Sequence, residues 1–200
     1  MYQAIHGLAA TSGGESIAEG IAVKTPEEIT KAIVSEYVDD ILLVDEFAIE
    51  SAVQTMVETG KLIVEGAGAA PLAAVIQQSE RFAGKKIGLV ACGANIDSRL
   101  LSSILLRGMV RHGKMVRLRI AISDQPGFLA QVAQHIGEVG GNIVEIYHQR
   151  IFYDVPAKRT EVDIVVETRD SAHVEEIIKR LSSGGFNTRR LDDTASETGI

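Results

Sequence analysis

Two glycine-rich stretches carry the residue types that could hold a small polar ligand. Ala91-Cys-Gly-Ala-Asn95 follows an apolar run and precedes a helical pattern. Val64-Glu-Gly-Ala-Gly-Ala-Ala70 has the same layout, with one acid, Glu65, before its glycines. Ligands of α/β sheets bind beyond the carboxyl ends of the strands, where small residues let them approach the backbone. The two stretches therefore predict a ligand cleft, although neither has the G-x-G-x-x-G pattern of a dinucleotide-binding fold.

Each of these residues also has a plainer interpretation. Cys92 could be an inert, buried small hydrophobe, and a nucleophilic role is less favoured because no neighbouring histidine marks an activated thiolate. Glu65 could simply cap the helix that follows it. The glycine-rich stretch 11–20 ends in Glu19 and Gly20, which could line the same cleft.

A third candidate site is Asp124-Gln-Pro-Gly127, which lies between an apolar strand pattern and an amphipathic helix pattern. Pro126 suits a first helical turn, where its missing N–H is not needed. The turn aims backbone N–H groups and a carboxylate at one point, which a small amino acid could use. The helix ends at Gly140-Gly141, residues that tolerate a positive φ.

The first half of the chain must position the two glycine-rich stretches. Short apolar runs at 40–44, 62–64 and 87–90 are typical of strands that are covered on both faces. Helical patterns follow them, after Asp45, over about 67–81 and over about 96–112, and an earlier helix from Thr25-Pro26 should bury Ile29 and Ile33. Three strand–helix units predict a piece of an open, mostly parallel α/β sheet.

The second half has the order β-α-β-β-α-β. Strands are expected at about 115–123, 142–152, 159–168 and 186–191, and helices at about 127–139 and 171–183. This is the ferredoxin-like order, with four antiparallel strands and two helices on one face. We expect the opposite sheet face to carry Ile, Val and Tyr residues and to pair with a second subunit, giving a homo-oligomer.

Composition excludes several classes of protein. The formal charge of −7 argues against non-specific nucleic-acid binding. A single cysteine rules out an internal disulfide and fits a reducing compartment. No apolar stretch approaches the roughly 20 residues of a membrane helix, and no signal peptide is recognisable. We therefore expect a soluble, cytoplasmic protein with no membrane partner, and no metal site is predicted.

Several motifs together resemble a known enzyme family. The stretches 17–23, 64–69 and 92–95 occur in the order and with the separations found in the C-terminal part of threonine ammonia-lyase (threonine dehydratase), a pyridoxal-phosphate enzyme of fold type II. The second half resembles the ACT regulatory domain that one branch of this family carries. There the matching residues are Asp124, Pro126, Gly127 and the Gly140-Gly141-Asn142 turn, and the stretch 146–150 resembles that branch's second strand.

The resemblance implies roles for individual residues. Cys92 stands where the family places a Ser or Cys beside the pyridine nitrogen of pyridoxal phosphate, and such a neutral group favours β-elimination. Gly93 would let the ring pack closely, Glu65 would lie near the same edge, and Gly20 is a weaker match. The implied effector-binding residues are Asp124, Pro126, Gly127, Gly141 and Asn142. His148 and Arg150 would serve the regulatory interface, or form an exposed strand pair.

One essential motif of the family is missing from the 200 residues. The family binds its cofactor through a lysine in a Ser-x-Lys-x-Arg-Gly stretch, and no lysine here has that setting. We therefore predict no catalytic residue, a truncated catalytic portion at 1–113 followed by an ACT domain at 114–200, and no deamination of threonine or serine unaided. The alternatives are an ACT-type module that dimerises and binds isoleucine or valine without turnover, and a mis-started gene product with no independent role.

Overall fold

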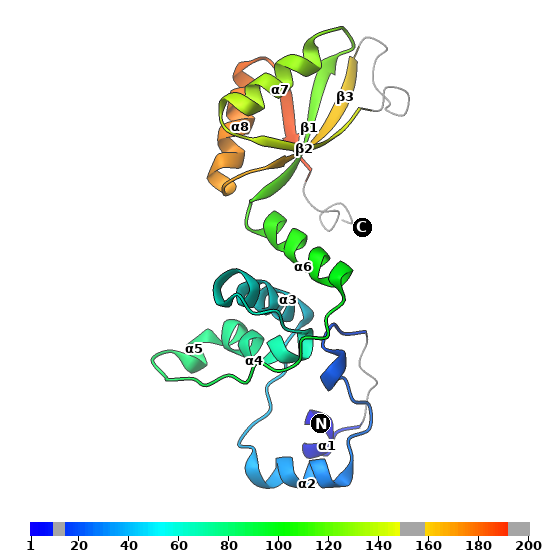
Figure 1. Ribbon diagram of the computed structural model, residues 1–200, viewed down its shortest axis with the longest axis vertical. Coiled ribbons are helices and arrows are strands. Elements are labelled where there is room, and N and C mark those ends of the chain that lie inside the picture. Colours follow the sequence, from blue (N-terminus) through cyan, green and yellow to red (C-terminus); the bar gives the residue numbers. More distant parts are fainter. Residues whose placement is uncertain (10–14, 149–158, 192–200) are drawn as a thin grey trace. The chain divides into compact units, whose positions relative to one another are not determined.

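The computed structural model describes residues 1–9, 15–148 and 159–191. The chain divides into two compact units, Met1–Gly108 and Met109–Ile200, which are called unit 1 and unit 2 below (Figure 1). Each unit has a hydrophobic core of its own.

Unit 2 is built on one antiparallel sheet of four strands in the order β2-β3-β1-β4. The strands are β1 (Met115–Ser123), β2 (Asn142–Tyr147), β3 (Arg159–Glu167) and β4 (Asn187–Arg190). Helices α7 (Phe128–Glu138) and α8 (Ser171–Ser183) cover the same face of the sheet (Figure 1). The predicted ferredoxin-like arrangement is confirmed, although β2 ends at Tyr147 and the rest of its predicted range, from 149, lies outside the described residues.

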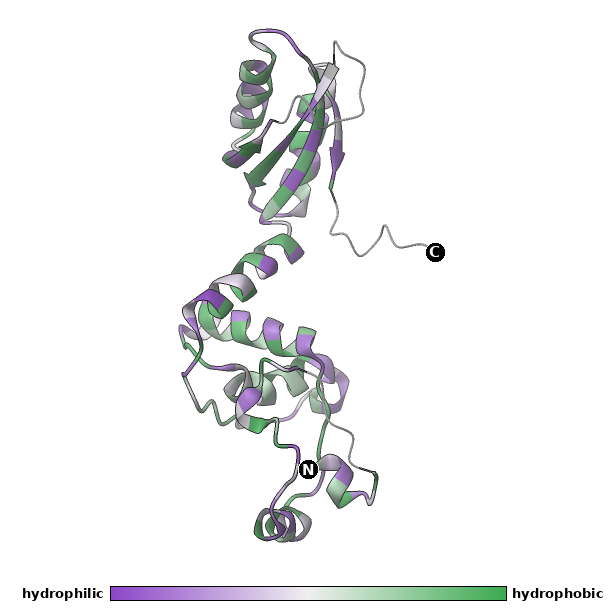
Figure 2. Ribbon diagram, turned by 90° about the vertical axis from the view of Figure 1, so that its right-hand side faces the viewer, coloured by the Kyte–Doolittle hydropathy of each residue, from purple (hydrophilic) through white to green (hydrophobic). Residues whose placement is uncertain are grey.

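The core of unit 2 follows from the alternation along β1. Val116, Leu118, Ile120 and Ile122 are all buried beneath the two helices. Figure 2 shows hydrophilic and hydrophobic positions alternating along the strands. Each such side chain contributes about 1.5–3 kcal/mol when it leaves water, so one sheet face and two helical stripes suffice to hold the unit together.

The outer face of this sheet, opposite α7 and α8, differs from the prediction. It carries Val165 and Tyr147, residue types that were expected there, but it also carries a charged cluster, because Arg119 of β1 pairs with Asp163 of β3. Asp163 is fully buried between Arg119, whose Nε donates to Oδ1 at 2.6 Å, and Arg117, whose Nη2 donates to Oδ2 at 2.7 Å. Burial raises the pKa of the Asp163 carboxyl, but the hydrogen bonds from Arg119 and Arg117 outweigh that effect and hold the pKa below its usual value.

Helices are the only regular secondary structure in the described part of unit 1, and non-helical segments connect them. Its elements are α1 (Tyr2–Ile5), η1 (Glu19–Ile21), α2 (Glu28–Tyr37), α3 (Glu46–Thr55), η2 (Met56–Gly60), α4 (Gly66–Gln77), α5 (Ser79–Phe82) and α6 (Ser98–Arg111), the last of which continues into unit 2. Asp45 caps α3 as predicted, since its Oδ1 accepts the N–H of Ala48 at 2.7 Å. The core lies between α3 and α4, where Ala52, Ala69 and Ala73 allow close packing.

The open parallel sheet predicted for unit 1 is not formed by the described residues. The runs 40–44, 62–64 and 87–90 have no strand partner. One backbone hydrogen bond, from Glu65 N–H to Gly93 O at 3.0 Å, joins the residues that follow two of them. An isolated extended segment gains no ladder hydrogen bonds, so an apolar run alone does not make a sheet.

The prediction that α2 buries an apolar stripe is also wrong. None of its residues is buried, and Ile29, Ile33 and Tyr37 are exposed. Among the described residues, no helix has the length and apolar character needed to cross a bilayer. In the same residues, no group of three or more His, Cys, Asp or Glu side chains is arranged so that it could hold a metal ion.

Candidate functional site

The structure brings the two glycine-rich stretches into direct contact. Gly68, in the first turn of α4, lies so close to the Cys92 carbonyl that a Cβ there would collide with it. A Cβ on Gly93, which has φ +80°, would collide with the Glu65 carboxylate. Gly20 approaches the same carboxylate, with 3.1 Å between the position of a Cβ and Glu65 Oε1. All four predicted cofactor-binding residues therefore lie together.

Two plainer interpretations of these residues do not hold. Cys92 is exposed, not a buried hydrophobe. Glu65 occupies the N-cap position of α4, but its side chain makes no capping hydrogen bond there. The thiol and the carboxylate thus lie at one edge of unit 1, where a ligand can reach them.

A cavity of about 480 Å³ lies next to Gly20 and Glu65. Its polar lining comes from Glu19, Glu65, Asn95 and Asp97. The lining therefore has three carboxylates and one amide and contains no cationic side chain. Such a surface suits ammonium, hydroxyl or amide groups and repels phosphate. Asp97 is the one polar residue of this lining that lies in none of the predicted motifs, although it follows Asn95 by only two residues.

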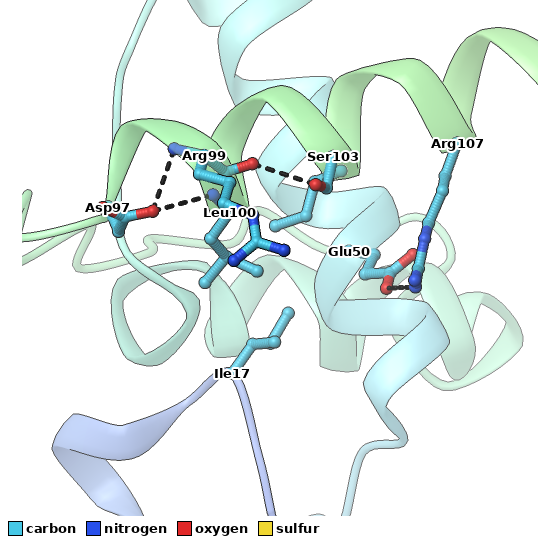
Figure 3. A pocket seen from close by; sticks show the side chains of 8 residues that line it. Ile17, Glu50, Asp97, Arg99, Leu100, Ser103 and Arg107 are labelled. Carbon is cyan, nitrogen blue, oxygen red and sulfur yellow. Dashed lines mark hydrogen bonds and ion pairs between the residues drawn. The ribbon is translucent and has the colours of Figure 1, made fainter.

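A second cavity of about 310 Å³ lies between α3 and the first turns of α6 (Figure 3). Its charged groups are largely engaged within the protein: Arg107 donates to Glu50 at 3.2 Å, and Asp97 accepts the N–H groups of Arg99 and Leu100 at 2.9 and 3.1 Å. It shares Ile17, Asp97 and Leu100 with the first cavity and is a side groove of the same edge. The sequence interpretation did not include it.

In unit 2, the predicted turn forms an exposed loop at the end of β1. Asp124, Pro126 and Gly127 are all exposed, and Gly127 has φ +94° as the N-cap of α7. Its left-handed backbone lets the chain enter the helix with the first N–H groups directed at the loop.

Gly141 and Asn142, the other two predicted effector residues, lie at the opposite end of the same sheet. Ser123 pairs with Arg159, whereas both Met115 and Asn142 pair with Glu167. A nine-residue strand separates the two ends by roughly 25 Å. One domain therefore does not bring the five residues together.

The turn at 140–142 is also engaged within its own domain. The Gly141 N–H donates to Ile136 O at 3.0 Å, and Asn142 Nδ2 donates to Glu167 Oε2 at 3.0 Å. His148 directly follows β2, and Arg150 lies outside the described residues.

Comparison with known proteins gives each half a family. Residues 1–93 match the pyridoxal-phosphate dependent enzymes, and residues 114–183 match the ACT domain. The chain thus joins a pyridoxal-phosphate dependent enzyme segment to an ACT domain. The resemblance to threonine ammonia-lyase is confirmed, and pyridoxal phosphate is the cofactor of that family.

Several curated relatives extend across both halves. The chain is 35% identical to the L-threonine ammonia-lyase of Thermotoga maritima over 177 residues, which are 88% of this chain and 44% of that protein. It is 39% identical to the L-threonine ammonia-lyase of Geobacter sulfurreducens over 171 residues, 86% of this chain and 42% of that one. The L-threonine dehydratase biosynthetic IlvA of Haemophilus influenzae is 26% identical over 178 residues, 88% of this chain and 34% of that one. The chain spans less than half the length of each.

Proposed function

We propose that this chain is the part of an L-threonine ammonia-lyase that supplies one wall of the cofactor cleft and the regulatory domain. The observation that carries the proposal is the contact of Glu65 with Gly93, the residue after Cys92, at one edge of unit 1. The resemblance implies that these three residues lie around the pyridine ring. The relatives named threonine ammonia-lyase and biosynthetic threonine dehydratase support threonine as substrate, with serine second, in amino-acid metabolism that leads to isoleucine.

The described residues fit only one edge of pyridoxal phosphate. The exposed Cys92 thiol and the Cβ-free surface of Gly93 suit a flat ring at close range. The neighbouring cavity, with three carboxylates and no cation in its lining, does not suit the phosphate. A lysine and a phosphate-binding loop must therefore come from another segment.

The residues of this chain would contribute by placing particular groups next to the cofactor ring and the substrate. With pyridoxal phosphate bound, the Cys92 thiol would lie beside the ring nitrogen and would not protonate it, which would favour elimination over reactions that need a stronger electron sink. The acidic cavity would attract the substrate ammonium. In the complete reaction threonine loses water and then, after water is added back, ammonia, so that one 2-oxobutanoate and one ammonia form from each threonine.

The proposal predicts that catalysis needs a second segment. The purified chain with pyridoxal phosphate and L-threonine should form no 2-oxobutanoate. Adding the part of the Thermotoga maritima relative that this chain does not match should produce it, and Cys92→Ala should reduce the rate of that mixture. Product from the 200 residues alone would overturn the proposal, and so would an inactive mixture in which the two polypeptides demonstrably bind.

Unit 2 is proposed to bind an amino acid such as isoleucine or valine at the Asp124–Gly127 loop. Because Asn142 lies roughly 25 Å away in the same domain, both groups can contact one ligand only if a second copy supplies one of them. The effector site is thus incomplete in one copy, which supports a homo-oligomer.

Calorimetry with isoleucine and valine tests the regulatory part. We expect binding to the chain, at least tenfold weaker for Asp124→Ala and unchanged for Glu175→Gln, an exposed acid on α8. Equal binding by the two variants would exclude the loop as the site.

A further inference from the structure

We propose that the Thr160 hydroxyl is a further ligand-binding group of unit 2, and that it donates a hydrogen bond to the carboxylate of a small amino acid at the first turn of α7. The inference rests on the proposed effector site at the Asp124–Gly127 loop. It adds to that site a buried polar group from β3, which none of the predicted motifs contains.

The Thr160 hydroxyl is buried without a hydrogen-bond partner. The residue is only 2% exposed, and its Oγ1 has no partner among the described residues. Burying a hydroxyl in this way is unfavourable, because its hydrogen bonds to water are lost and no others replace them. A group of this kind is therefore a candidate to bind a molecule from outside the chain.

A second threonine shows that burial in this sheet does not by itself leave a hydroxyl unpaired. Thr168 directly follows the other end of β3 and is also buried. Its Oγ1 donates to the Gly113 carbonyl, and its N–H donates to Lys114 O at 2.9 Å. The hydroxyl of Thr168 thus has a structural role in joining β3 to the start of β1, whereas that of Thr160 has none.

The strand register places Thr160 beside the Asp124–Gly127 loop. Thr160 pairs with Ile122, two residues before Asp124. It lies on the helix-covered face of the sheet, because it alternates in step with Val162, a residue of the core. Helix α7 begins at this end of the sheet and packs against β2, the strand next to β3 (Figure 1). Thr160 therefore lies at the end of the sheet where α7 starts.

A second unpaired polar atom lies at the same end of the sheet. Tyr147, the last residue of β2, pairs with Asp163 and lies on the outer face, where its ring centroid is 5.3 Å from the Arg117 guanidinium carbon. The alternation of side chains then places His148 on the helix-covered face, as it does Thr160. The His148 Nε2 is buried and has no partner among the described residues. Two neighbouring strands thus direct unsatisfied polar groups to one place.

The start of α7 defines the chemistry of the ligand. The helix has eleven residues, and no side chain caps its N-terminus at Gly127. Its first N–H groups and the positive end of its dipole favour an anionic group, and a carboxylate can also accept a hydrogen bond from a hydroxyl. Phe128 and Leu129 are partly buried and suit an aliphatic side chain, while the Asp124 carboxylate suits an ammonium. These features together fit a small aliphatic amino acid.

The experiment measures amino-acid binding to the full 200-residue chain by calorimetry. Thr160→Val, which keeps the shape of the side chain but removes the hydroxyl, should weaken L-isoleucine binding at least tenfold. Thr160→Ser, which keeps the hydroxyl, should restore most of the affinity. Thr168→Val is the matched control and should bind isoleucine as the unchanged chain does. L-isoleucinol, which lacks the carboxylate, should bind at least tenfold more weakly than isoleucine, with no further loss in Thr160→Val.

Thermal unfolding without ligand separates a binding role from a structural one. Thr160→Val should unfold at the same temperature as the unchanged chain or higher, because it removes a buried hydroxyl that has no partner. Thr168→Val should unfold several degrees lower, because it leaves the Gly113 carbonyl without its donor. A lower unfolding temperature for Thr160→Val would show that its hydroxyl is bonded within the protein and would overturn the inference.

The binding results separate this inference from the proposed effector site. Equal affinity of the unchanged chain and Thr160→Val for isoleucine would leave the effector site in place and overturn the role of Thr160. Equal affinity for isoleucinol and isoleucine would overturn the bond to the carboxylate. If neither isoleucine nor valine binds, the proposed effectors are refuted. Binding of L-threonine or L-serine that Thr160→Val weakens tenfold would then support the inference, and no binding of any of the four would overturn both.

Discussion

The two units of this chain differ in how far their apolar segments are paired and buried. In unit 2 every strand has a partner, and the apolar positions of β1 lie under two helices. In unit 1 three apolar runs stay unpaired and an amphipathic helix buries none of its residues. Alternation with period 2 marks a sheet that needs cover on one face only, which its own helices provide. Continuous apolar runs require cover on both faces, and the described residues of unit 1 do not supply that cover.

The largest expected difference between the units is in the cost of losing one leucine side chain. Leu118→Ala in β1, where the side chain is fully buried, should lower the free energy of unfolding by about 2–5 kcal/mol. Leu62→Ala, at a side chain that is 51% exposed, should change it by less than about 0.5 kcal/mol. Urea denaturation of both variants measures the contrast. Similar losses would mean that Leu62 is buried in the free chain.

A second test concerns the charged outer face of unit 2. Asp163→Asn should destabilise the unit by about 2–3 kcal/mol at pH 7, because two arginines lose a buried anionic partner. Since the folded pKa of Asp163 lies below the unfolded value, its contribution is present above about pH 4 and is lost as the pH falls through the folded pKa.

Denaturation at several pH values between 2 and 7 is the measurement for this test. The stability of the unchanged chain should fall more steeply with acid than that of Asp163→Asn. Glu138→Gln, which breaks the exposed pair with Arg180, serves as the control and should have a much smaller effect at pH 7. A variant with an unchanged acid profile would show that Asp163 does not titrate as described.

The smallest expected effects come from a pair of glycines around α7. Gly127→Ala places a side chain at φ +94° and should cost about 1 kcal/mol. Gly137→Ala, inside the helix with open space around its Cα, should stabilise by about 0.5–1 kcal/mol. Thermal unfolding should therefore shift in opposite directions. A stabilising Gly127→Ala would contradict the left-handed cap.

Much of the fold could be predicted because the relevant signals are local. The bounds of β1 and α8 follow from periodicity and capping residues, and Asp45 caps α3 because its side chain needs only the next turn. The burial of Asp163 could not be predicted, since it depends on the register between β1 and β3. Ile29 was expected in a core because its spacing is amphipathic, but spacing does not reveal whether a partner is present.

In the candidate sites, too, some features could be predicted from the sequence and others could not. That the two glycine-rich stretches line one cleft could be predicted, because both follow apolar runs and precede helices, but the contact of the Glu65 carboxylate with Gly93 could not. The separation of Asp124 from Asn142 was not predicted, although α7 and the return of the chain carry it along the whole length of the sheet between them. Motif residues that are close in a family pattern are therefore not necessarily close in one domain.

The central claim is that the apolar runs of unit 1 are unpaired in the free chain while the strands of unit 2 are paired. Hydrogen exchange of the 200-residue chain alone tests it most directly. The account predicts amides of Ile63 and of 87–90 that exchange at nearly the rate of an unfolded peptide, whereas amides of Leu118, Ile120 and Ile164 are strongly protected. Comparable protection in both sets would contradict it.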